Sequence, residues 1–246
     1  MLKALLAAWE VPAPDEIVRS QASVEVRYVR SGVRRTLGLW AGRPGQLGWD
    51  VWAADEELNG LAPGGWKFMA RLRVKGEVGG TADSDPEQLC RGEYPWPLAG
   101  EALDSRLVDE GRKFVEPMLW FFEDRADLGR LLLARDPHKP WWLGPEFADN
   151  TGSWQRGEIF AQPVSGTSAG VVLAVILARH TGDEELERLA MNNLSDMADH
   201  IVDGTGLAFR TVVGSYAEEF QEWSSVDLSD LAQLAPKRRR RRATTT

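Results

Sequence analysis

Trp66-Lys67-Phe68-Met69-Ala70-Arg71-Leu72-Arg73-Val74-Lys75 is the stretch that decides the fold. Its largest apolar side chains occupy every second position, which is the period of a β-strand with one face in a core and one in water. We therefore expect Phe68 and Leu72 to point inward, and Arg71 and Arg73 to point outward. The outward cationic row is interpreted as a solvated face or a protected sheet edge, with an anion-binding surface as the alternative.

Three earlier segments show the same alternation, at residues 24–28, 36–40 and 47–52. Short turns that contain glycine separate them at residues 31–32 and 42–45. Such short connections join antiparallel neighbours, and one polar face per strand is typical of a sheet that is covered on one side only. The sequence therefore predicts an antiparallel meander of about four strands, preceded by a short helix near the N-terminus.

Beyond residue 100 the apolar spacing changes to threes and fours, which is typical of helices. Two helices are expected between residues 103 and 132, divided at Pro117 and with Asp127 as the cap of the second. The run from Val171 to His180 is apolar on every side, which predicts a buried helix that ends at Gly182.

The next helix begins with acidic residues after Gly182, as the helix dipole favours, and has a regular apolar stripe. The members of that stripe are Leu186, Ala190, Leu194, Met197 and Ile201. A strand at residues 207–213 and a short helix at 216–223 follow. The expected fold class is α+β, with a sheet half (1–100), a helical half (101–235) in one continuous domain with it, and a disordered basic tail (236–246).

Charge is distributed unevenly along the chain. The 29 Lys and Arg residues face 37 Asp and Glu residues, formally −8, and six of the cations form the run Lys237, Arg238, Arg239, Arg240, Arg241, Arg242. Residues 1–236 alone are formally −14. An acidic body attracts basic partners and repels nucleic acid, whereas the tail predicts weak, sequence-independent contact with nucleic acid through counterion release.

Cysteine usage and hydropathy indicate the compartment. Cys90 is the single cysteine, so no disulfide can form within the chain, which favours a reducing, cytoplasmic location. The longest apolar run, Val171 to Ala178, has eight residues, against the roughly 20 that a membrane-spanning helix requires. We therefore expect no membrane association.

One motif has a catalytic mechanism attached to it: Gly166-Thr167-Ser168-Ala169-Gly170. It has the form of a nucleophile elbow, in which small residues let a serine occupy a tight turn between a strand, here 159–164, and a helix. Serine needs a base within hydrogen-bond reach, and the candidates are Asp203 and His200. The motif and the Asp203-Gly204 dipeptide resemble the active-site serine and aspartate of patatin-type lipases, which implies ester hydrolysis.

A structural interpretation of the same motif stays open. The small residues then mark the tightly packed start of a buried helix, with Ser165 or Thr167 as its N-cap. Residues 166–190 also resemble the helix hairpins of α/α-toroid proteins, a likeness that carries no functional residue.

A second candidate site is the long aromatic connection between residues 136 and 168. Its tryptophans lie among carboxylates and amides, a mixture that stacks against and hydrogen-bonds a ligand or anchors a partner. The candidates are Trp141, Trp142, Glu146, Trp154 and Glu158. The alternative is that the tryptophans pin a long connection to the body of the protein.

Metal and cofactor sites find no support in the sequence. The three histidines, His138, His180 and His200, fall in different elements, and none has a second ligand at zinc-site spacing. The glycine-rich turns contain neither a phosphate loop nor a dinucleotide fingerprint. We expect neither a metal nor a cofactor.

Together these observations favour an intracellular, non-enzymatic binding or regulatory protein with an acidic body that neutralises a basic protein partner. Bacterial immunity proteins and antitoxins share this charge character. The alternative function is a serine hydrolase that uses Ser168.

Overall fold

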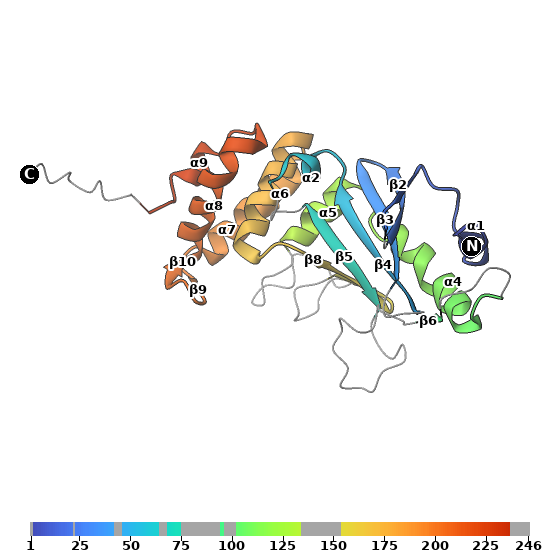
Figure 1. Cartoon of the computed structure of the whole chain (residues 1–246). Coiled ribbons are helices and arrows are strands. Elements are labelled where there is room, and N and C mark those ends of the chain that lie inside the picture. The colour runs from blue at the N-terminus through green and yellow to red at the C-terminus, as the bar shows by residue number, and fades with distance from the viewer. Residues whose placement is uncertain are drawn as a thin grey trace, which may run out of the picture.

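The computed structural model describes residues 2–21, 23–41, 46–63, 68–74, 94–95, 102–133 and 154–236. Within these ranges the protein is an α+β fold, as expected: an antiparallel sheet lies beside a group of helices (Figure 1). The basic tail from Lys237 onward lies outside the described residues.

The sheet has the strand order β1-β2-β3-β4-β5-β8-β7, and β6 pairs with the start of β4. Its strands are β1 (Glu16–Arg19), β2 (Ser23–Arg30), β3 (Val33–Ala41), β4 (Gln46–Asp55), β5 (Met69–Val74), β6 (Tyr94–Pro95), β7 (Trp154–Arg156) and β8 (Ile159–Pro163). The expected four-strand meander corresponds to β2–β5. The sheet is larger than predicted because four short strands extend it.

The alternation in β5 is confirmed on its inner face and only in part on its outer face. Phe68 and Leu72 are 0% and 1% exposed, and Arg71 is exposed, as expected. Arg73 is only 7% exposed, so the prediction that it points into open solvent is wrong. β5 is also not the protected edge that the cationic row suggested, because β4 pairs with one side and β8 with the other, where Phe160 is the direct partner of Arg73.

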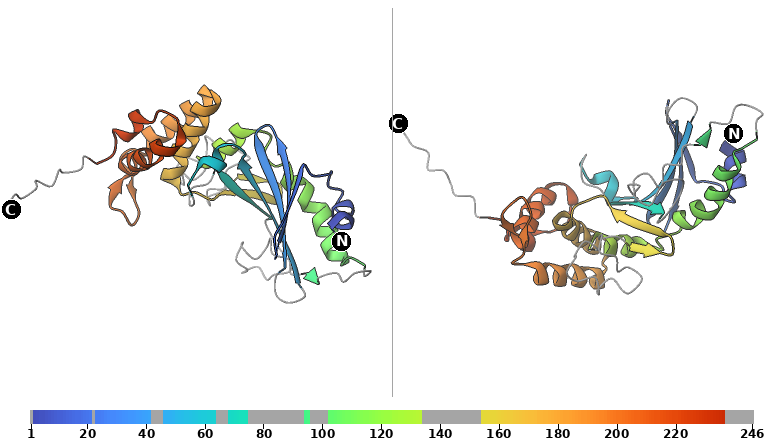
Figure 2. Two further views of the ribbon diagram at one scale, coloured as in Figure 1. Left: turned by 45° about the horizontal axis from the view of Figure 1, so that its top comes forward. Right: turned by 90° about the horizontal axis from the view of Figure 1, so that it is seen from below.

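Helices α1 (Leu2–Ala8), α4 (Ser105–Leu119) and α5 (Arg125–Leu132) cover the inner face of the sheet (Figure 2). Trp9, just after α1, donates its indole N–H to the Leu107 carbonyl at 2.9 Å and packs on Gly111, where a Cβ has no room. The two helices expected between residues 103 and 132 are present as α4 and α5, but the break between them lies at residues 120–124: Pro117 sits in the last turn of α4, which ends two residues later.

The second layer of the molecule is built around α6 (Thr167–Thr181), which is buried from Ser168 to Ala178. Helices α5, α7 (Glu184–Met197) and α8 (Phe209–Ser224) pack against it, and α2 (Leu58–Leu61) and α9 (Ser229–Ala232) contribute Leu58 and Leu231 to the same core. Gly182 ends α6 in the left-handed conformation with φ 71°, and Asp183 caps α7 through the Leu186 N–H. The predicted buried helix and its termination are confirmed.

Three expectations about the helical half are corrected. Ile201 is 54% exposed and outside the α7 stripe, because α7 ends at Met197 and Ile201 starts the hairpin of β9 (Ile201–Val202) and β10 (Leu207–Ala208). The predicted strand at 207–213 contains only β10, since α8 begins at Phe209. The cap of α5 is Asp124, and Asp127 instead accepts the Glu123 N–H from within the first turn.

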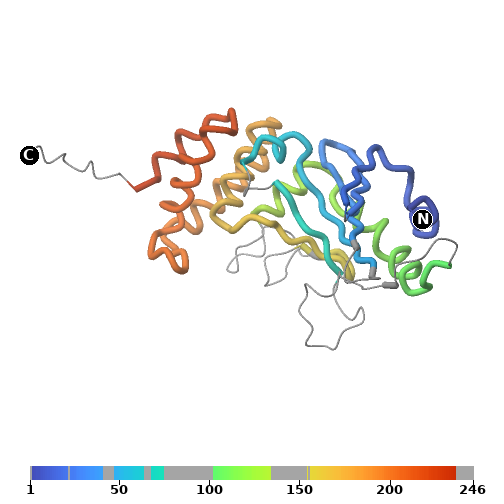
Figure 3. Tube along the Cα trace, in the orientation of Figure 1, coloured from blue at the N-terminus to red at the C-terminus, as the bar shows by residue number. Residues whose placement is uncertain are grey.

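The two layers are joined by α5 and by the path of the chain. Leu128 and Leu131 belong to the core under the sheet, whereas Leu132 belongs to the core around α6. After α5 the chain returns to the sheet as β7 and β8, which pair beside β5, before it enters α6 (Figure 3). The helical half therefore supplies two strands of the sheet.

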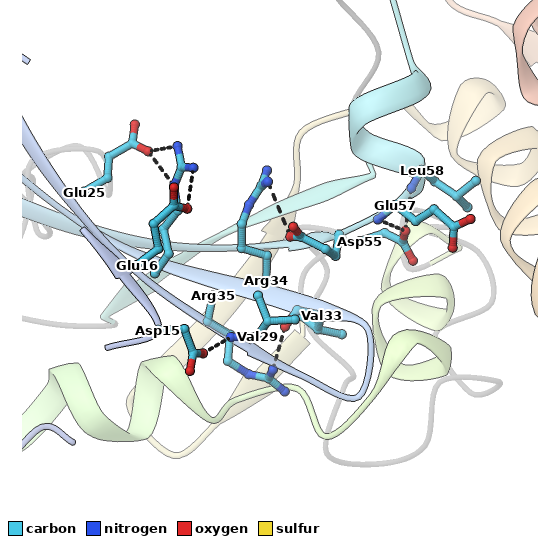
Figure 4. Close-up of polar contacts among 12 residues, drawn as sticks. Asp15, Glu16, Glu25, Val29, Val33, Arg34, Arg35, Asp55, Glu57 and Leu58 are labelled. Carbon is cyan, nitrogen blue, oxygen red and sulfur yellow. Dashed lines mark hydrogen bonds and ion pairs between the residues drawn. The ribbon is translucent and has the colours of Figure 1, made fainter. Parts of the chain in front are cut away.

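A buried ion pair lies at this junction. Asp55, at the end of β4, has a fully buried side chain that receives two hydrogen bonds from Arg125 at 2.5 and 3.0 Å. It also accepts the backbone N–H groups of Glu57 and Leu58, which starts α2 (Figure 4). One carboxylate at the end of β4 thus accepts hydrogen bonds from the start of α2 and from Arg125 in the first turn of α5.

Candidate functional site

Ser168 lies in the first turn of α6 and is 7% exposed. The helix start packs on the end of α5 so closely that Gly170 has no room for a Cβ against the Leu132 carbonyl. The N-cap is Gly166, so the expected capping by Ser165 or Thr167 is wrong. The close packing of α6 on α5 therefore explains why residue 170 is a glycine.

The proposed bases lie in another part of the helical half. His200 precedes β9 and Asp203 follows it in the turn of the β9–β10 hairpin, and both are exposed. Neither residue belongs to the element that carries Ser168. The serine hydrolase remains a prediction without a geometric observation in its favour.

The aromatic candidates separate into a core residue, a surface residue and three positions outside the described residues. Trp154 is fully buried in β7, with its ring centroid 6.0 Å from that of Phe122. Glu158 is exposed in the turn to β8 and forms an ion pair with Lys113 at 2.6 Å. Trp141, Trp142 and Glu146 lie outside the described residues. The pinning role that we considered for these tryptophans fits Trp154.

Formal charge is strongly segregated between the two layers. Residues 167–236 contain 12 Asp and Glu residues against three Arg and no Lys, formally −9. Residues 1–75 contain 11 Lys and Arg against eight Asp and Glu, formally +3. The acidity of the whole chain therefore does not describe its sheet-forming N-terminal segment. Residues 167–236, which form the C-terminal part of the helical half, are therefore the part that attracts cations.

A cleft of about 610 Å³ opens in this acidic half, where the end of α6 meets the segment between α8 and α9. Its lining residues are Arg179, His180, Ser225, Val226, Asp227, Ser229 and Asp230. Ser225 adopts the left-handed conformation with φ 55° at the end of α8, which turns the chain into the wall of the cleft. Side chains from three separate elements thus converge here.

Arg179 organises the cleft wall. Its guanidinium binds Asp230 at 2.8 and 3.0 Å, Glu187 at 2.8 Å and the Asp227 carbonyl. These contacts, first that with Asp230, raise the pKa of Arg179 despite its partial burial. The same pairing lowers the pKa of Asp230. Because four of the five N–H groups of Arg179 already bond acceptors, the main role of this side chain is to hold the wall in place.

Asp227 and Asp230 are both exposed carboxylates of the cleft, and Asp227 meets Arg179 through its main-chain carbonyl. The Asp227 Oδ1 accepts the Ser229 N–H at 3.0 Å, and this bond lowers the pKa of Asp227. The carboxylate is therefore ionised at neutral pH. The guanidinium of Arg179 pairs with two carboxylates, those of Asp230 and Glu187. The lining of the cleft carries the carboxylates of Asp227 and Asp230 against the one guanidinium of Arg179.

His180 connects the cleft to the junction of the two layers. Its Nε2 lies 2.9 Å from Oε2 of Glu57, and that carboxylate also lies 3.6 Å from Arg125. The hydrogen bond with His180 is the main cause that lowers the pKa of Glu57. A chain of polar contacts therefore runs from the buried Asp55 to the cleft.

Sequence reasoning did not identify this cleft. Its signals were weak: a lone Arg179 at the end of an apolar helix, and two aspartates in the short segment before the tail. No local sequence motif indicates that these positions lie together, because Arg179 and Asp230 are 51 residues apart along the chain.

Comparison of the chain with protein-family models, with curated proteins and with solved structures finds no match. Within the described ranges, no group of three His, Cys, Asp or Glu side chains is placed to hold a metal ion. None of the helices in those ranges has the length and apolarity needed to cross a membrane.

Proposed function

We propose that the protein is a non-enzymatic binding protein whose acidic helical half binds a basic protein partner, with the cleft as the contact for one of its Lys or Arg side chains. The observation that carries this proposal is the concentration of twelve carboxylates against three guanidinium groups in residues 167–236. Such a surface steers cationic partners into contact and disfavours anionic ones.

The cleft adds a specific contact to this general attraction. Asp227 is ionised and exposed, and its anchoring bond from Ser229 fixes the carboxylate without neutralising it. A Lys or Arg side chain entering the cleft therefore meets a charged acceptor already held in place. A charge-assisted hydrogen bond of this kind is stronger than a neutral one.

Titration of the full chain with a hexa-arginine peptide, followed by calorimetry, tests the proposal. We expect binding that weakens as salt is raised, and an Asp227→Asn variant that binds about tenfold more weakly, or about 1.4 kcal/mol. Asn keeps an acceptor for the Ser229 N–H, so the fold is conserved in this variant.

Asp203→Asn is the matched control, because it removes one exposed carboxylate of the same half that does not line the cleft. Its affinity is expected to stay within about twofold of the wild type. Equal losses in both variants would mean that only overall charge matters, and an absence of binding would reject the proposal. Capture of partners from cells with the wild type and Asp227→Asn side by side then identifies the natural partner.

The serine hydrolase alternative has its own test. It expects a fluorophosphonate probe to label Ser168, and Ser168→Ala to lose ester hydrolysis while keeping its fold. A folded protein that is not labelled at any serine would remove this alternative.

A further inference from the structure

The outer face of the sheet, opposite α1 and α4, carries two tryptophans that each cover a glycine of the neighbouring strand. Ring atoms of Trp52 in β4 lie 2.6 Å from the point where a Cβ on Gly38 of β3 would stand. In return, ring atoms of Trp40 in β3 lie 2.6 Å from the corresponding point on Gly48 of β4. Both tryptophans are partly exposed.

The strand register places both rings on this face with Asp50 between them, and the Asp50 Oδ1 also lies 2.6 Å from the Cβ point of Gly38. Trp40 is the direct partner of Gly48, whereas Gly38 is the partner of Asp50, two residues further along β4. Gly38 and Gly48 are therefore diagonal neighbours across one strand pair, a separation of about 7–8 Å. We call this pair of rings, Trp40 and Trp52, the tryptophan platform.

Cations and carboxylates both flank the platform, since Glu25, Gly38 and Asp50 form the row beside it. Arg27, Thr36, Trp52 and Arg71 form one continuous row across β2, β3, β4 and β5. Arg27 is held by Glu25 at 2.6 Å and Glu16 at 3.0 Å. Arg71 is exposed, and its guanidinium forms no ion pair with any residue of the described ranges. An exposed guanidinium therefore stands directly beside Trp52.

We propose that this face binds single-stranded nucleic acid, with bases stacked on the tryptophan platform and a backbone phosphate on Arg71. Every base has an aromatic face, and stacking on tryptophan beside cationic groups is the usual basis of sequence-tolerant binding to single strands. The segment that forms these strands is formally +3, in contrast to the acidic helical half. A duplex does not fit this mode, because its bases are already stacked on one another.

Fluorescence anisotropy of a labelled 12-nucleotide single strand, titrated with the full chain, tests the inference. Trp40→Leu and Trp52→Leu keep apolar contact with the underlying glycine but remove the indole face. Each is expected to weaken binding roughly 5- to 150-fold, as loss of one stacked base does. Arg71→Gln is expected to weaken it less, and Arg19→Gln, an exposed arginine of β1, serves as its matched control.

The cationic run at residues 237–242 is also expected to bind polyanions, so its contribution must be separated. A chain that ends at Pro236 is expected to keep the part of the affinity that depends on Trp40 and Trp52, and this part persists at 0.5 M salt, since stacking is not screened. A duplex of the same sequence is expected to bind at least tenfold more weakly.

Two results would overturn the inference. One is an affinity that stays within twofold in both tryptophan variants, with melting temperatures showing that they are folded. The other is loss of all binding when the residues after Pro236 are removed. Neither result bears on the cleft around Asp227, so failure here is distinguishable from failure of the proposed function.

Discussion

The sheet and the helical half of this protein each bury a hydrophobic core, but the formal charges of the two segments have opposite sign. The sheet segment is formally +3, and its outer face carries Trp40, Trp52 and Arg71 beside the carboxylates of Glu25 and Asp50, whereas residues 167–236 are formally −9. The net charge of −8 is a sum over the whole chain and describes neither of these two segments. Partner classes are therefore better inferred for each layer than for the whole chain.

The two layers also bury their polar groups differently. In the sheet, Arg35 is buried and donates to main-chain carbonyls, including that of Phe122 at 2.6 Å, and burial lowers its pKa to about 10. In the helical half, Arg179 remains partly open and is surrounded by carboxylates. The first arrangement fixes a strand to a loop, and the second shapes a cleft wall.

The largest expected effect tests the junction on which the comparison depends. Replacing Asp55 by Ala removes the partner of Arg125 and two acceptor contacts at the start of α2. A broken buried pair destabilises proteins by about 3–5 kcal/mol, which urea unfolding measures. The exposed neighbour Glu57, replaced by Ala, is the control and should change stability by less than about 1 kcal/mol. A small effect of Asp55→Ala would show that the layers are held together elsewhere.

The next effect tests the two faces of the sheet. Leu72→Ala is expected to reduce the free energy of unfolding by about 2–5 kcal/mol, because Leu72 is buried in the core under the sheet. Arg71→Ala is expected to change it by less than about 0.5 kcal/mol, as exposed positions do. If Arg71→Ala were the more damaging change, the strand register that defines the tryptophan platform would be wrong.

A smaller effect appears only at high pH and sharpens the description of the sheet. Burial, with a contribution from Asp15, raises the pKa of Tyr28 to about 12. Its unfolded value is near 10, so its stabilising contribution is complete below pH 10 and is lost as pH rises through 12. The loss amounts to about 2–3 kcal/mol.

The stability difference between wild type and Tyr28→Phe, measured at pH 8 and pH 12, isolates this contribution. Phe has no ionisable group, so the wild type should lose its advantage as pH rises. At pH 8 the variant should lose about 1 kcal/mol through the hydrogen bond to the Pro12 carbonyl. A difference that does not change between the two pH values would contradict the buried position of the phenol.

The smallest expected effect concerns the chain after Pro236. The segment up to Ala235 packs on α8 at Gly214, where a Cβ has no room, and we expect the cations beyond it to add nothing to stability. Deleting residues 237–246 should leave the melting temperature unchanged within error and abolish retention on heparin at low salt. A drop of several degrees would instead show that the tail binds the acidic helical half, and would blur the contrast between the two layers.

The local elements followed from the sequence because their causes are local. The alternation at residues 66–75 predicted a strand with Leu72 inside, since side chains of a strand alternate whatever its neighbours are. The buried helix α6 followed from its apolar run, and its end followed from Gly182 and Asp183, whose turn and capping chemistry acts within a few residues. The contrast between the acidic body and the basic run at residues 237–242 was likewise evident from the sequence.

Tertiary structure alone decided which distant positions meet. Pairing of β8 with β5 made β5 an interior strand and set Phe160 beside Arg73, and the β3–β4 pairing placed Trp40 over Gly48 and Trp52 over Gly38. The cleft arose because the end of α6 packs near α9, 51 residues away along the chain. Such contacts depend on pairing and packing between segments, for which periodicity and local propensity carry no information.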